Sequence, residues 1–105
     1  MKKIIGGKLY DTETAAEVGS WWNGRSRNDF DHCYETLFRN SKGAYFLHGQ
    51  GGARSVYAQN AGDMLCGGEA IQPMSEDDAK LWAEQHLDAS EYIAEWGAPS
   101  EAEGR

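Results

Sequence analysis

Two apolar runs separated by a turn signal form the clearest pattern in the chain. Residues 32–39 and 44–49 are rich in Thr, Leu, Phe and Tyr, and they flank the sequence Asn40-Ser-Lys-Gly43. Asn and Gly favour tight turns, and Gly readily adopts the left-handed backbone that closes a hairpin. The pattern therefore predicts a β-hairpin at residues 33–49.

Weaker strand patterns lie on both sides of this hairpin. Residues 4–10 are typical of a first strand, although Gly6-Gly7 is an alternative turn. The rest of the middle of the chain predicts a short strand at 54–59, a loop at 60–63 and a last strand at 68–72.

Helix signals occur once near the start of the chain and again near its end. The spacing Thr14-x-x-Glu17 matches a capping box and predicts a short helix at 13–19. Ser75 followed by three acids is a strong helix start, and it predicts helices at 75–87 and 89–96. Apolar residues at helical spacing define the packed face of the longer helix, with Trp82 as the expected core anchor: Ala79, Trp82, Ala83, His86 and Leu87.

These elements together predict an α+β fold. We expect a small antiparallel sheet of three to four strands centred on the hairpin at 33–49. Short helices pack on it, including an acidic C-terminal helical segment. Residues 1–97 are expected to form a single domain and residues 98–105 a frayed acidic tail.

Composition narrows the classes of partner. The chain has 105 residues and a formal net charge of −7, which disfavours direct binding to nucleic acid or to a membrane and suits a partner with a basic surface. No apolar run is long enough to span a bilayer, and Cys33 and Cys66 lie far apart in the sequence. We expect a monomeric cytoplasmic protein with reduced thiols and no cofactor.

The negative charge is concentrated at one end of the sequence. Residues 1–74 contain eight acids and eight Lys or Arg, whereas residues 75–105 contain nine acids and two Lys or Arg. In a continuous helix the 4, 3, 4 spacing of the acids within 84–95 would place them along one edge. This edge is either an ordinary solvated helix face or a row of charge that mimics the phosphates of DNA. The predicted partner-binding residues are Glu76, Asp77, Glu84, Asp88, Glu91 and Glu95.

Candidate chemistry elsewhere in the sequence is weak. The histidines and cysteines His32, Cys33, His48 and Cys66 do not have the spacing of a known zinc site, so we predict no metal site. For a Cys33 or Cys66 nucleophile with a histidine base, no third residue that would orient the base is indicated, and we predict no catalytic residue. Gly49-Gln-Gly-Gly52 lacks the ending of a phosphate-binding loop and indicates a bulge or turn at a strand end. For the pair Trp21-Trp22 we expect one ring in the core, and an exposed recognition ring is the alternative.

Four segments resemble a family of small proteins carried by phages and other mobile elements, some of which are anti-CRISPR proteins. The similar segments are Lys8-Leu-Tyr-Asp-Thr-Glu-Thr-Ala15, Glu35-Thr-Leu-Phe-Arg39, Gly43-Ala-Tyr-Phe-Leu-His-Gly-Gln-Gly-Gly-Ala53 and Pro73-Met-Ser-Glu-Asp-Asp-Ala-Lys-Leu-Trp-Ala83. A type I-C inhibitor is the member that the chain most resembles.

The resemblance implies a non-enzymatic inhibitor of a CRISPR-Cas surveillance complex in a host bacterial cell. Such complexes hold nucleic acid in basic channels, which an acidic surface can occupy in place of target DNA. Two other functions remain open. One is a protein-binding module of a mobile element that acts through an aromatic or apolar hairpin face, and the other is a small enzyme that depends on a Cys or an Asp.

Overall fold

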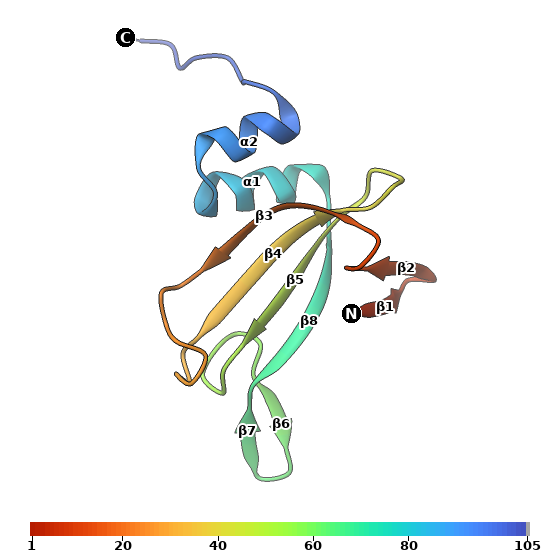
Figure 1. Ribbon diagram of the computed structural model, residues 1–105, viewed down its shortest axis with the longest axis vertical. Helices are drawn as coiled ribbons and strands as arrows, with labels where there is room; N and C mark the ends of the chain where they lie inside the picture. Colours follow the sequence, from red (N-terminus) through yellow and green to blue (C-terminus); the bar gives the residue numbers. More distant parts are fainter. Residues whose placement is uncertain (105) are drawn as a thin grey trace.

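Four antiparallel strands form the central sheet, in the order β3, β4, β5, β8 (Figure 1). The computed structural model describes residues 1–104. The fold is α+β, with two helices that follow β8, and the elements of the sheet are β3 (Ala16–Trp22), β4 (Cys33–Arg39), β5 (Tyr45–Gly51) and β8 (Gly68–Met74). The remaining elements are β1 (Lys2–Ile5), β2 (Lys8–Asp11), β6 (Gln59–Ala61), β7 (Met64–Cys66), α1 (Glu76–His86) and α2 (Ala89–Trp96).

The predicted central hairpin is confirmed as β4 and β5. Asn40 shapes its turn, because the side-chain Oδ1 accepts hydrogen bonds from the backbone N–H groups of Lys42 at 3.0 Å and Ala44 at 2.9 Å. Gly43 has φ 85°, the left-handed conformation for which a glycine is suited. The hairpin lies in the middle of the sheet, paired with β3 on one side and with β8 on the other.

The predicted helix at 13–19 is wrong, because residues 16–22 form β3. A short capping-box signal is outweighed here by pairing along the whole edge of β4. Gly19 also has a packing role that a helix would not give it. A Cβ atom there would lie 2.6 Å from Cδ1 of Leu87, so the missing side chain lets the end of α1 approach the sheet.

The segments on either side of the sheet also differ from the prediction. Residues 4–10 belong to two strands, β1 and β2, and Gly6 and Gly7 with φ 59° and 76° form the turn that the sequence offered as an alternative. The predicted strand at 54–59 is wrong, since residues 52–58 form turns closed by bonds such as Ser55 N–H to the Gly52 carbonyl. The predicted loop at 60–63 is instead the tip of the projecting β6–β7 hairpin (Figure 1).

The two faces of the sheet are covered by different elements. The helices cover one face, where Leu37, Leu47 and Trp82 are buried in one cluster. The β1–β2 hairpin covers part of the opposite face, where Tyr10 packs edge-on against Phe46. Both predicted C-terminal helices are confirmed, and α1 begins at Ser75, whose side chain accepts a hydrogen bond from the backbone N–H of Asp78.

We expect Trp82→Ala to lower the free energy of unfolding by roughly 3–5 kcal/mol, because it leaves a large cavity in the core. Trp82 is 6% exposed, whereas its neighbour Leu81 is 55% exposed on the outer side of the same helix. Leu81→Ala is therefore the matched control and should change stability by only about 0.5 kcal/mol. Urea unfolding of the two variants measures both values, and similar losses would contradict this orientation of α1.

Candidate functional site

The predicted acidic edge does not run along one helix. The backbone leaves the helical conformation at Leu87, and Asp88 begins a second helix as its N-cap. The Asp88 side chain accepts a hydrogen bond from the backbone N–H of Glu91, and the Glu91 carboxylate accepts in return from the N–H of Asp88. The prediction of a single straight edge is therefore wrong. The sequence Asp88-x-x-Glu91 indicates this start of a second helix, since it has the spacing of a capping box.

The last acid of the predicted edge points into the molecule. Glu95 is 11% exposed, and its carboxylate forms an ion pair with Arg39 and accepts a hydrogen bond from the Tyr45 hydroxyl at 2.6 Å. Burial, followed by this carboxylate, raises the pKa of Tyr45. Glu91 is half-buried beside Gly19. Glu95 holds α2 against the sheet, Glu91 caps the start of α2, and neither carboxylate extends freely into solvent.

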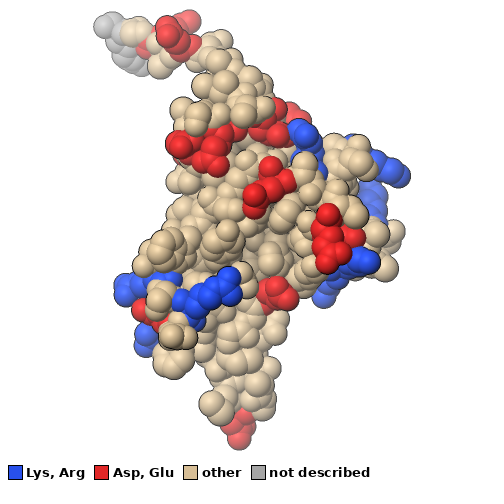
Figure 2. Space-filling model, viewed as in Figure 1, with Lys and Arg blue, Asp and Glu red and all other residues tan. Residues whose placement is uncertain are grey.

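Five acids remain exposed on the helices and define what we call the acidic helical surface: Glu76, Asp77, Asp78, Glu84 and Asp88. Lys80 is the only Lys or Arg in residues 75–97, and it contacts Glu76 at 3.5 Å. Hydrogen bonds from the Ser90 hydroxyl and from the backbone of Glu91 lower the pKa of Asp88, which keeps it charged. Figure 2 shows acidic side chains gathered over the helical end of the molecule, with a basic side chain beside them and most of the other Lys and Arg side chains toward other parts.

A second carboxylate site, which no sequence motif marks, lies under the helices. Glu35 of β4 accepts a hydrogen bond from the indole N–H of Trp82 at 2.9 Å and another from the Tyr57 hydroxyl. Gly49 makes room for this arrangement, since a Cβ atom there would lie 1.9 Å from Cζ of Tyr57. Glu35 thereby joins β4, α1 and the turns of residues 52–58.

This carboxylate does not activate its neighbours for nucleophilic chemistry. Burial, with a smaller contribution from Glu35, raises the pKa of the Cys33 thiol and also that of the Tyr57 hydroxyl. A catalytic cysteine needs the opposite shift, because the thiolate is the nucleophile. The arrangement of Glu35, Cys33 and Tyr57 is therefore suited to holding the fold.

The histidines are distributed over different parts of the molecule. The ring of His86 packs against Trp21 and Trp82, with centroids 4.3 and 5.2 Å away, on the packed face that the sequence predicted. His48 contacts Glu69 at 2.9 Å on the opposite face of the sheet. Within residues 1–104, His32, Cys33, His48 and Cys66 do not come together as a metal-binding group.

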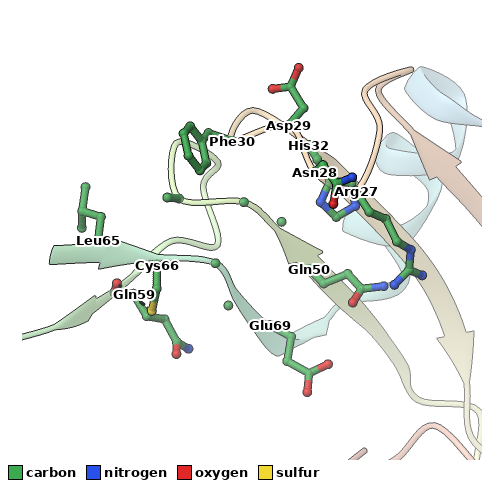
Figure 3. A pocket seen from close by; sticks show the side chains of 15 residues that line it. Arg27, Asn28, Asp29, Phe30, His32, Gln50, Gln59, Leu65, Cys66 and Glu69 are labelled. Atoms are coloured by element: carbon green, nitrogen blue, oxygen red, sulfur yellow. Dashed lines mark hydrogen bonds between the residues drawn. The ribbon is translucent and has the colours of Figure 1, made fainter.

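Of the two adjacent tryptophans, one ring lies in the core, as expected, and the other is exposed. Trp21 packs against the helix-side core, whereas Trp22 is 53% exposed and lies at the edge of the opposite face. Beyond it, residues 23–32 bound a hollow of about 750 Å³ between this loop and the β6–β7 hairpin (Figure 3). The exposed side chain of Phe30 and the glycine-rich strand ends line this hollow.

Comparison of the chain with models of protein families, with curated proteins and with solved structures finds no match. Among the helices in residues 1–104, none is long and apolar enough to cross a membrane. The geometry of the surfaces described above and the resemblance of the sequence are therefore the observations that bear on function.

We expect Tyr57→Phe to lower the free energy of unfolding at neutral pH by about 1–3 kcal/mol, because it removes a hydrogen bond to a carboxylate. The raised pKa of Tyr57 adds a pH dependence. The stability it contributes is fully present below the ordinary tyrosine pKa of about 10 and is lost as the pH rises further, since the unfolded chain releases the proton first. Urea unfolding should therefore show that the difference in free energy of unfolding between wild type and Tyr57→Phe becomes smaller as the pH rises from neutral to alkaline. A difference that widens would contradict the role given to Glu35.

Proposed function

We propose that the protein is a stoichiometric inhibitor of a CRISPR-Cas surveillance complex. Its acidic helical surface binds a basic nucleic-acid channel in that complex and blocks the binding of target DNA. One observation supports this proposal above the others: five exposed carboxylates on two adjoining helices face solvent with a single lysine among them. The resemblance to phage and mobile-element proteins supports the choice of a CRISPR complex as the partner.

The fold is suited to presenting these charges rigidly. Ala79, Trp82 and Ala83 bury the inner side of α1, and Asp77 and Glu84 lie two helical turns apart on its outer side. A rigid row of charge loses little conformational entropy on binding, and it attracts a basic channel before contact. Such an inhibitor acts as a monomer in the cytoplasm of the host bacterial cell.

The proposed contact set is smaller than the one suggested by the sequence. Glu91 and Glu95 form contacts within the protein, so we assign them to the stability of α2 rather than to the partner. Asp78 joins the set, because it is exposed beside Asp77. The acidic helical surface therefore lies on α1 and at the start of α2, and it does not continue along α2 as the predicted edge did.

A second candidate function is supported by the opposite side of the sheet. Trp22 and Phe30 are 53% and 60% exposed near the same end, so an aromatic surface is available for a protein partner. Salt separates the two candidates, since binding through exposed charges weakens steeply with ionic strength and binding through aromatic rings does not. The raised pKa of Cys33 gives the alternative of a cysteine-dependent enzyme no support.

Reversal of Asp77 and Glu84 to Lys should abolish the electrostatic attraction and slow association with a purified type I-C effector complex by roughly tenfold or more. Both side chains are exposed on the outer side of α1, so the fold should persist. Association rates measured by surface plasmon resonance at low and moderate salt test this expectation, with urea unfolding as a check of the fold.

The matched control reverses Glu13 and Asp63, which are exposed and lie outside the helices. Each reversal adds two charges, so both double variants gain four. The proposal requires the control to bind much faster than the helix variant. An equal loss of association rate in the two variants would mean that net charge alone matters. Association of the helix variant at the wild-type rate would refute the acidic helical surface as the contact.

A further inference from the structure

The end of the sheet farthest from the helices has a row of side chains that the β1–β2 hairpin leaves uncovered. The strand register places one residue from each strand in this row: Trp22, Tyr34, Gln50 and Glu69. The loop of residues 23–32 folds across the row and brings His32 and Arg27 beside it. Polar and aromatic groups from five segments therefore meet at one place.

His32 is an unusual component of this cluster. His32 is only 8% exposed as a residue, and its imidazole makes no hydrogen bond within residues 1–104, although its ring nitrogens are not fully enclosed. The backbone is held firmly, because its N–H donates to the Asp29 carbonyl at 3.1 Å and its carbonyl accepts from the Gly52 N–H at 2.9 Å. His32 lines two adjoining hollows, so its ring nitrogens are accessible from space that a ligand can enter.

Arg27 supplies the charge at this position. The neighbouring arginines are occupied, since Arg25 contacts Asp29 at 3.6 Å and Arg54 contacts Asp31 at 3.0 Å. Arg27 forms no ion pair within residues 1–104, and its guanidinium extends into the hollow toward the amide of Gln50 (Figure 3).

The acids that line the hollow are engaged with other groups. The Asp29 carboxylate contacts Arg25, and the Glu69 carboxylate contacts His48 at 2.9 Å. Besides the amides of Asn28 and Gln59, the groups left to interact with a ligand are the guanidinium of Arg27, the imidazole of His32 and the amide of Gln50. All three donate hydrogen bonds, and a guanidinium matches the two oxygens of a carboxylate or phosphate.

We propose that Arg27 and His32 form a binding site for an anionic group, either a phosphate or a carboxylate. Arg27 donates two N–H groups to the anion, His32 donates one from its ring and Gln50 donates from its amide. The hollow of about 750 Å³ is large enough to hold a small organic molecule that carries this group. The site lies at the opposite end of the sheet from the acidic helical surface, so it does not depend on the proposed inhibitor function (Figure 1).

Nuclear magnetic resonance of the intact protein tests the site. Sodium phosphate and sodium acetate are titrated separately at constant ionic strength and pH, and the ring signals of His32 and the Nε–H signal of Arg27 are followed. We expect saturable shifts at both residues. Saturation with phosphate alone identifies a phosphate site, and saturation with both anions identifies a site for either group.

The variants Arg27→Gln and His32→Asn should each lower the affinity for the anion by roughly tenfold, because each removes one of the proposed donors. Lys42→Gln is the charge-matched control, since Lys42 is exposed in the β4–β5 turn and lines no part of the hollow. The control should bind as wild type does. Shifts that rise linearly with both anions, or equal weakening in Arg27→Gln and Lys42→Gln, would overturn the proposal.

Discussion

The structure depends on burying one face of a four-stranded sheet beneath the helices α1 and α2. Trp82 is the largest of the buried side chains in that contact, and its indole N–H needs an acceptor once it is removed from water. Glu35 supplies the acceptor and also receives the Tyr57 hydroxyl, so one carboxylate satisfies donors from two segments. An unpaired donor at this depth would cost about 1–3 kcal/mol, a large part of the stability of a small domain.

This arrangement separates the two ends of the molecule. At one end, α1 and α2 are fixed to the sheet by Trp82 and by the Glu95 contacts, and their outer sides carry exposed acids. At the other end, the loop of residues 23–32 holds Arg27 and His32 over the open face. A protein with net charge −7 can therefore present a strongly acidic surface and a separate site suited to an anion.

Local signals predicted those parts of the fold that local interactions determine. The turn at Asn40 and Gly43 and the acidic start of α1 are encoded within a few residues, and both are found. The segment at 13–19 carries a helix signal, but its pairing with β4 is decided by residues twenty positions away along the chain. Local propensity is weaker than such pairing.

The sites were harder to predict for the same reason. The prediction of an acidic edge required a continuous helix, although the capping-box spacing of Asp88 and Glu91 indicates a break between two helices. The contacts of Glu35 with Trp82 and Tyr57 span more than twenty residues of sequence, and no short motif marks them. The sequence indicates His32 only as a candidate metal ligand, because its burial and its proximity to Arg27 follow from how the loop folds across the sheet.

The central claim is that the acidic helical surface contacts a basic channel of a CRISPR effector complex. Zero-length carbodiimide cross-linking of the protein to a purified type I-C complex, followed by mass spectrometry, tests it most directly, because it joins carboxylates only to lysines that touch them. We predict that cross-links form mainly from Asp77, Asp78 and Glu84 to lysines lining the nucleic-acid channel, and that bound target DNA prevents them. Cross-links formed mainly from Glu13, Asp63 or Glu69, or cross-links that persist with DNA bound, would contradict the claim.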